Sequence, residues 1–440
     1  MRKLRKNAAG IDIGSKSIFV GLEGQEVRSF PTFTGDLKKA VSFLVDQGIE
    51  TAAMEATGVY WIILYDLLME SGIEVWLVDG RQTKQVPGRK TDVKDCQWIQ
   101  ELHSYGLLNR CFVPEKDIKS MRSYQRLRED HIRSGAMHIN HMQKALTEMN
   151  IRLGEVLSQV HGASGMAIIG AILEGERNPE VLLSLCHKSI RTKKEDLVLR
   201  SLEGFYTEEG LFRLRQAFDA YGFYQVQISE CDAMIQQLME KINSYHENSG
   251  NRQEIEAVKN RKPIRHNKPD VSYLGGHLVR IFGGRDATVL PGITDYTWMQ
   301  LYSETGTDLE KWPTEKHYTS WLGLAPGQHN SGKMKRNRRR KSQPKAGQIF
   351  RQIAQSLIES KKIGLGAFGR KLKAKRGAGV AVKGTARKLA ILYWRLMVKG
   401  LEYTERGIKD YEERVIMQKE KWLQKAAKKL GYQLNTVPIH

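Results

Sequence analysis

The sequence predicts an α/β domain at the start of the chain and a mainly helical remainder. Three short β-like runs come first, at Ala8–Ile13, Ile18–Leu22 and Glu26–Phe33, and tight turns separate them. A helix with one apolar face over Asp36–Gln47 and a short strand at Thr51–Glu55 follow. Beyond residue 113, apolar residues recur instead at three- and four-residue steps, which is the pattern of long amphipathic helices.

The remaining elements of the first segment indicate its topology. A helix from about Tyr60 to Glu70 and a strand at Glu74–Val78 complete a β-α-β unit. Three antiparallel strands followed by β-α-β is the order of a ribonuclease-H-like fold, in which the first strand is central and the fourth lies beside it. We therefore expect Asp12 and Glu55, near the ends of those two strands, to lie close together.

The charge of the chain predicts a polyanionic partner. Its 440 residues are enough for two or three domains, and they carry a formal net charge of +21 with a pI of about 9.6. Such a surplus favours nucleic acid over a membrane surface. No apolar run approaches the roughly 18 residues of a membrane-spanning helix, so we expect no membrane partner.

The cysteines argue against a zinc site and against a disulfide framework. Cys96, Cys111, Cys186 and Cys231 are far apart and form no Cys-x-x-Cys pair. This usage fits the reducing cytoplasm.

A second pair of acids accompanies Asp12 and Glu55. Asp92 and Asp95 lie in the segment KTDVKD, where we predict a helix that begins near Thr91, and their spacing places both carboxylates on one face. Capping of that helix is the simpler explanation for either aspartate alone. Four acids from two strand ends and one helix face instead suit two-metal chemistry on a phosphate, with Mg²⁺ as the cofactor.

These acids resemble the Asp-Glu-Asp-Asp set of the DEDD transposases of bacterial insertion sequences. That family includes Piv-type DNA invertases and bridge-RNA-guided recombinases. The segments EATGVYW, from Glu55, and KTDVKD, from Lys90, match the family closely. The resemblance implies a RuvC-like domain in which Asp12, Glu55, Asp92 and Asp95 are catalytic and hold the metal. It also implies donor and target DNA, a non-coding bridge RNA, a homodimer or homotetramer, and a cytoplasmic, nucleoid-associated location.

The middle of the chain is predicted to be helical and coiled-coil-like. We expect its last helix at Gln225–Ile242, and a basic linker over residues 246–272. His131, His138 and His141 have no cysteine or acidic partner at ligand spacing, so we expect them to face the surface or RNA rather than a metal.

The second informative site is a Ser-Gly pair in a basic field. Ser331 precedes Gly332 and an arginine- and lysine-rich run, and a helix is expected at Ala346–Ser360. Nearby cations lower the cost of an alkoxide and of a pentavalent phosphate. In the resembling family, the serine at this place is the nucleophile that becomes joined to DNA. Lys333 departs from the second glycine common in the family, and Ser342 is the alternative nucleophile.

Further segments suggest contacts with the nucleic-acid backbone. Leu290–Thr294 resembles the turn of a helix-hairpin-helix element, whose N–H groups can meet a phosphate. Two basic stretches, Gly366–Gly377 and Gly384–Ala390, resemble the closing helices of the same family. The residues expected to bind nucleic acid are Gly292, Lys333, Lys335, Arg336, Arg338, Arg339, Arg340, Lys341, Arg370, Lys371, Lys373, Lys375, Arg376, Arg387 and Lys388.

The sequence thus predicts four regions and one main function. The regions are a RuvC-like catalytic domain at 1–110, a helical segment at 111–245, a linker at 246–272 and a mainly α transposase domain at 273–440. The function is site-specific DNA recombination with a Ser331–DNA intermediate. Three alternatives stay open: a RuvC-type nuclease in which water attacks, a non-enzymatic nucleic-acid-binding protein, and an actin-like ATPase, which lacks a second glycine-rich phosphate motif.

Overall fold

The computed structural model describes most of the chain as two compact units, Met1–Val113 and Pro114–His440. For residues 92, 245–248, 330–331 and 334–335 only the backbone is described. The described residues are 2–83, 92–248, 262–264, 266–326, 330–331, 334–335, 344–360, 364–400, 416–417 and 420–432.

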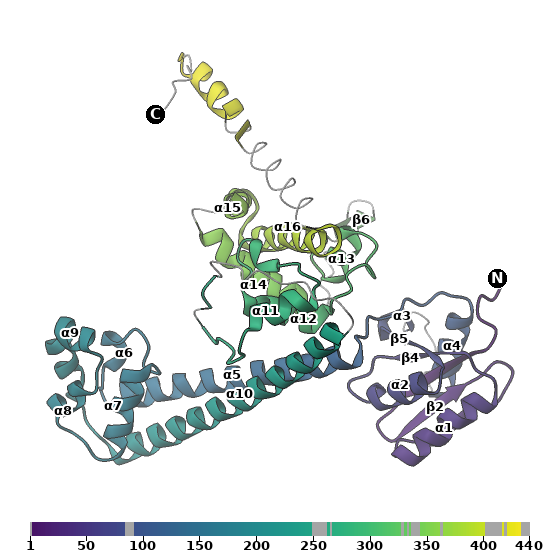
Figure 1. Cartoon of the computed structure of the whole chain (residues 1–440), viewed down its shortest axis with the longest axis horizontal. Helices are drawn as coiled ribbons and strands as arrows, with labels where there is room; N and C mark the ends of the chain where they lie inside the picture. Colours follow the sequence, from purple (N-terminus) through teal and green to yellow (C-terminus); the bar gives the residue numbers. More distant parts are fainter. Residues whose placement is uncertain are drawn as a thin grey trace. The chain divides into compact units, whose positions relative to one another are not determined.

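A five-stranded sheet forms the centre of the first unit (Figure 1). Its strands are β1 (Ala8–Ile13), β2 (Ser17–Gly21), β3 (Arg28–Pro31), β4 (Thr51–Glu55) and β5 (Glu74–Val78), in the spatial order β3-β2-β1-β4-β5. β1 pairs antiparallel with β2 and parallel with β4. The predicted meander followed by β-α-β is therefore confirmed, and the unit has a ribonuclease-H-like topology.

Helices cover both faces of this sheet. α1 (Thr34–Asp46) and α2 (Trp61–Glu70) pack on the face that carries Ile11 and Met54. Side chains alternate along a strand, so Ala53 points to the other face. There it packs with residues of α4 (Asp92–Ser104).

Two paired glycines allow α4 to lie directly on the sheet. Gly10 of β1 is opposite Gly21 of β2 in the register. A Cβ atom on Gly10 would overlap the backbone of Cys96 and Gln100 in α4, and one on Gly21 would lie 3.0 Å from the Gln97 nitrogen. The helix thus contacts the strands backbone to backbone, and this contact determines how its first turn lies relative to β1.

Two long helices dominate the second unit. α5 (Lys116–Glu148) and α10 (Glu208–Asn248) lie side by side along much of their length (Figure 1). They run antiparallel, since Lys241 of α10 pairs with Asp117 and Arg213 pairs with Glu148. The predicted long amphipathic helix is therefore present and has a partner helix.

The predicted start of the last middle helix, at Gln225, was wrong. α10 begins at Glu208 and continues to Asn248, three residues into the predicted linker. Gly222 and the exposed Phe223 interrupt the apolar period, which hides the first part of the helix in the sequence. Packing against α5 stabilises α10 at Gly222 and Phe223, where the sequence itself favours a helix only weakly.

Four shorter helices pack at the end of the α5–α10 pair where α5 ends and α10 begins. They pack with the adjoining ends of α5 and α10 around a core that includes Ile168, Ile172 and Leu182. The helices are α6 (Leu153–Val156), α7 (Ala163–Leu173), α8 (Pro179–Ser184) and α9 (Lys188–Ser201).

The rest of the second unit is mainly helical, as predicted. Its core contains an aromatic cluster in which Tyr318 and Phe350 pack around Tyr393. Residues 420–429 are also helical. The elements are α11 (Leu274–Ile281), the 3₁₀ helix η1 (Ala287–Val289), α12 (Asp295–Thr305), α13 (Glu315–Trp321), β6 (Asn330–Ser331), β7 (Met334–Lys335), α14 (Lys345–Glu359), α15 (Gly364–Arg376) and α16 (Ala378–Lys399).

Ionic contacts join α5 to this helical region. Arg126 pairs with Glu304 of α12 through two bonds of 2.9 Å, and Arg122 donates to the Glu304 carbonyl at 2.7 Å. Arg128, which is 1% exposed, binds Asp232 of α10 at 2.6 and 3.2 Å and the Tyr296 hydroxyl at 3.1 Å.

None of the described helices is both long and apolar enough to span a membrane.

Candidate active site

Two of the predicted acids lie at the carboxyl ends of adjacent parallel strands. The register pairs Ile11 with Met54, so Asp12 and Glu55 occupy the next positions. Because Gly10 and Ala53 face α4, the alternation of side chains directs both acids to that same face. The structure therefore brings Asp12 and Glu55 together at one edge of the sheet, beneath α4.

α4 contributes a third carboxylate to this face. Asp95 is half-buried, one residue before the buried Cys96. Burial raises the pKa of the Cys96 thiol to about 12, and the negative charges of Asp12 and then Asp95 add to that rise. The charges of Asp12 on β1 and Asp95 on α4 thus both raise the pKa of the same thiol. Asp92 is the first residue of α4, and its side chain lies outside the described residues.

Two residues that the sequence reasoning missed lie against the Glu55 carboxylate. The Thr83 hydroxyl donates a hydrogen bond to its Oε1 atom. Gly80 leaves space for the other oxygen, since a Cβ there would lie 2.7 Å from Oε2. Both residues belong to α3 (Gly80–Thr83), directly after β5. No local pattern could have found Thr83, because it lies 28 residues from Glu55 in the chain.

The chemistry of these donors suits a hard divalent cation. Carboxylate oxygens are the ligands that Mg²⁺ prefers, and Mg²⁺ usually takes only one or two of them beside water and substrate phosphate. Among the side chains that the structure describes, no three histidine, cysteine or acidic groups gather closely enough to hold a metal ion by themselves. Asp12 and Glu55, with Asp95 beside them, therefore fit a cation whose coordination is completed by further oxygens.

Ser331 lies in the second unit, whereas the carboxylates lie in the first. It ends β6, and its register partner is Met334 of β7 in a two-stranded hairpin. Only the backbone of Ser331 and Lys335 is described. The other members of the predicted basic run lie outside the described residues, as does Ser342, the alternative nucleophile. Those basic residues are Lys333, Arg336, Arg338, Arg339, Arg340 and Lys341.

The predicted basic residues of α15 and α16 fall into two groups. Four of them form an exposed cluster on the C-terminal half of α15: Lys371, Lys373, Lys375 and Arg376. The others contact the protein itself or are half-buried. Arg370 donates to the carbonyl oxygens of Ile358 and Ser360, which end α14. Lys388 lies 3.9 Å from the ring centre of Phe368, and Arg387 is half-buried.

The turn that contains Gly292 is packed and tied within the second unit. It connects η1 to α12, and Gly292 has a φ of +76°. A Cβ on Gly292 would come within 2.7 Å of Ile353 on α14. The Lys262 ammonium donates to the carbonyl oxygens of Thr288, Leu290 and Ile293 around the turn. Close packing against α14 therefore explains why position 292 is a glycine. Lys262, which the sequence analysis placed in the linker, holds the turn through its hydrogen bonds.

The three middle histidines lie along the α5–α10 pair. His138 stacks on Tyr224 of α10 with ring centres 5.6 Å apart, and His131 lies 5.8 Å from the same ring. Burial lowers the pKa of His138. His141 is exposed, so only this one of the three faces solvent openly.

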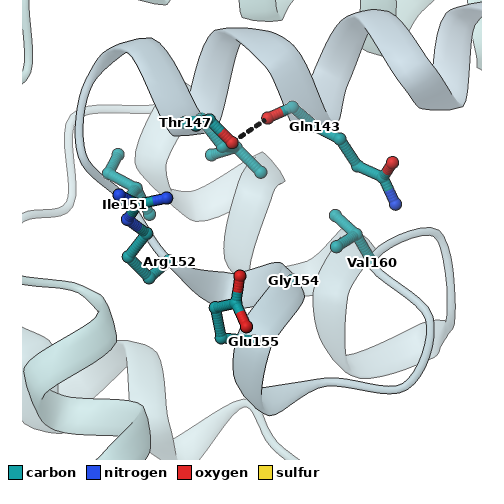
Figure 2. A pocket seen from close by; sticks show the side chains of 8 residues that line it. Gln143, Thr147, Ile151, Arg152, Gly154, Glu155 and Val160 are labelled. Carbon is teal, nitrogen blue, oxygen red and sulfur yellow. Dashed lines mark hydrogen bonds between the residues drawn. The ribbon is translucent and has the colours of Figure 1, made fainter.

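A pocket of about 230 Å³ lies where α5 ends and α6 begins (Figure 2). Thr147 on its wall donates to the Gln143 carbonyl at 2.8 Å. Arg152 and Glu155 also line it. None of the predicted site residues lines this pocket, so it is separate from the candidate active site.

The sheet order gives the first unit a ribonuclease-H-like fold, with Asp12 and Glu55 at the edge of the sheet. A family model for DEDD transposases, described as "Transposase", matches residues 9–151, which include all four predicted acids. A second model, described as "Transposase IS116/IS110/IS902 family", matches residues 287–366, which include Ser331. Together the two matches cover slightly more than half of the chain. No curated protein matches it.

The chain therefore belongs to the IS110 family of DEDD transposases. It is a DNA transposase of an insertion sequence, and DNA is its substrate.

Proposed function

We propose that this transposase is a site-specific recombinase in which a carboxylate-bound Mg²⁺ and the Ser331 hydroxyl act on one scissile phosphate. The observation that carries the proposal is that Asp12 and Glu55 end adjacent parallel strands and face α4, the helix that carries Asp95. Asp92 would complete the set from the first turn of α4. In this assignment residues 1–110 form the catalytic domain, and residues 273–440 form the domain with the nucleophile.

The proposed chemistry conserves the energy of the phosphodiester bond. The Ser331 oxygen forms a bond to phosphorus while the bond to one deoxyribose oxygen breaks, and that sugar leaves as a free hydroxyl. Attack by another DNA hydroxyl then reverses the step, joins the strands and releases the serine. A cation on the acids would stabilise the charge that develops on the phosphate. The carboxylates hold and orient that cation on rigid elements.

The basic residues would position the nucleic acid. The exposed cluster on α15, formed by Lys371, Lys373, Lys375 and Arg376, suits contacts with backbone phosphates. Such binding weakens steeply as salt rises. We further propose that a non-coding bridge RNA selects donor and target DNA, that the protein acts as a dimer or tetramer, and that it works in the cytoplasm on nucleoid DNA.

The decisive experiment traps the protein on DNA. The purified protein is incubated with donor DNA, target DNA, the flanking non-coding RNA and Mg²⁺, then denatured and analysed for a covalent adduct. We expect Ser331→Ala to abolish the adduct, Ser342→Ala to retain it, and Glu55→Gln to abolish it. DNA cleavage by Ser331→Ala would instead favour a nuclease in which water attacks.

A further inference from the structure

The carboxylate of Glu55 is hydrogen-bonded at one oxygen and has its other oxygen beside Gly80. Thr83, only 9% exposed, donates its hydroxyl proton to Oε1. Gly80 lies against Oε2 and has no Cβ, which would otherwise come within 2.7 Å of that oxygen. The hydrogen bond from Thr83 limits the rotation of the Glu55 carboxylate, although a glutamate side chain normally has several rotamers.

Thr83 is itself held by the helix that carries the other acids. The Trp98 indole nitrogen donates to the Thr83 carbonyl at 3.2 Å. Trp98 lies three residues after Asp95 on α4, so the two share one side of the helix. Glu55 and α4 are therefore connected through one threonine, by its side chain on one side and by its backbone on the other.

We propose that Thr83 is the positioning residue for Glu55. It fixes the Glu55 carboxylate relative to the acids of α4, so that these groups meet one divalent cation in a single geometry. The inference rests on the proposed role of Glu55 as a cation ligand. Groups that orient a metal ligand by hydrogen bonding change metal affinity or activity by about 10- to 100-fold when they are removed.

The hydroxyl, rather than the bulk of Thr83, is the active feature. Valine has the same shape as threonine and lacks the donor, whereas serine keeps the donor and lacks the methyl group. Thr51 offers a matched control in the same sheet. It is also buried, and its hydroxyl pairs with His103 at 2.9 Å, at the opposite end of β4 from Glu55.

The test measures Mn²⁺ affinity of the full-length protein by calorimetry, because Mn²⁺ takes the same oxygen ligands as Mg²⁺ and needs no turnover. We expect Thr83→Val to weaken Mn²⁺ binding by about 10-fold or more. Thr83→Ser and Thr51→Val should bind as the unmodified protein does. In adduct formation, Thr83→Val should need a correspondingly higher Mg²⁺ concentration. Normal Mn²⁺ affinity in a folded Thr83→Val protein overturns the proposal.

A second variant covers the case in which Thr83→Val does not fold. Gly80→Ala keeps the Thr83 hydroxyl and places a methyl group against Oε2. It should also weaken Mn²⁺ binding, and unchanged affinity would count against the restraint. Glu55→Gln distinguishes failure of the proposed cation site from failure of the proposed role of Thr83. If Glu55→Gln binds Mn²⁺ normally, the proposed cation site itself is wrong. If Glu55→Gln loses binding and Thr83→Val does not, only the role of Thr83 is wrong.

Discussion

The two units of this transposase attach a helix to its neighbours by opposite means. In the first unit, α4 lies on the sheet through Gly10 and Gly21, and backbone meets backbone. In the second, α5 is held by arginines that pair with Glu304 and Asp232. The first contact sets the position of α4 closely, because backbone atoms have no rotamers with which to adapt. In the second contact, arginine charges of α5 are paired with carboxylates of the protein itself.

The second contact also changes how the net charge of the chain should be interpreted. Arg122, Arg126 and Arg128 bind groups of the protein, and so do Lys262 and Arg370. A surplus of +21 predicts a nucleic-acid partner, yet it does not say which cations meet that partner.

Removing one partner of the buried ion pair should have the largest effect. Asp232→Ala leaves the Arg128 guanidinium buried without its carboxylate, and we expect a loss of about 3–5 kcal/mol in the unfolding free energy of the second unit. Urea denaturation followed by circular dichroism measures the loss. Replacing both partners, Arg128→Met with Asp232→Leu, should recover much of it.

An exposed pair on the same helix provides the control. Asp130→Ala removes the partner of Arg133 on the surface of α5, and it should cost roughly 0.5 kcal/mol or less. Equal effects of Asp232→Ala and Asp130→Ala would show that burial does not decide the strength of these contacts.

A methyl group at Gly10 should break the contact between α4 and the sheet. Gly10→Ala forces the new Cβ into the backbone of α4, and we expect a cost of about 3 kcal/mol, near the upper end for overpacking. Hydrogen exchange of β1 and α4 amides in the full chain measures it. Gly35→Ala, in α1, is the control, because its added Cβ would meet no atom within 4 Å apart from those of its own helical turn. Similar exchange in both variants would contradict the backbone contact.

Acid should weaken the first unit by charging a buried group. His103 is fully buried, and burial, followed by the positive charge of Arg5, lowers its pKa to about 4. The unfolded chain binds a proton near pH 6.5, so the full stability is present above that pH. The free energy of unfolding of the first unit falls by roughly 3 kcal/mol as the pH drops from 6.5 to 4.

The pH dependence can be assigned to this one histidine. His103→Gln should flatten the decline in exchange protection of β1 and α4 between pH 6.5 and 4. His141→Gln, which changes an exposed histidine of α5, should leave that decline intact. An unchanged decline in His103→Gln would place the titrating group elsewhere.

Sequence reasoning worked best where the signal is local. The short β-like runs predicted β1, β4 and β5 at their observed bounds, and the order of elements predicted the sheet order. It worked less well where packing overrides the pattern, as at the start of α10, which continues through Gly222 because α5 supports it. The catalytic role of Ser331 stays a prediction, since its side chain lies outside the described residues.

The sequence by itself determined the strands of the first unit and where Asp12 and Glu55 stand on them, because hydrophobic pattern and residue type act over a few neighbouring residues. Only the tertiary structure decided that Thr83 meets Glu55 and that Gly10 must lack a side chain. It also decided that Arg370 caps α14. Each of these contacts joins residues brought together by packing, and the free energy of such a contact depends on three-dimensional distances that no short stretch of sequence encodes.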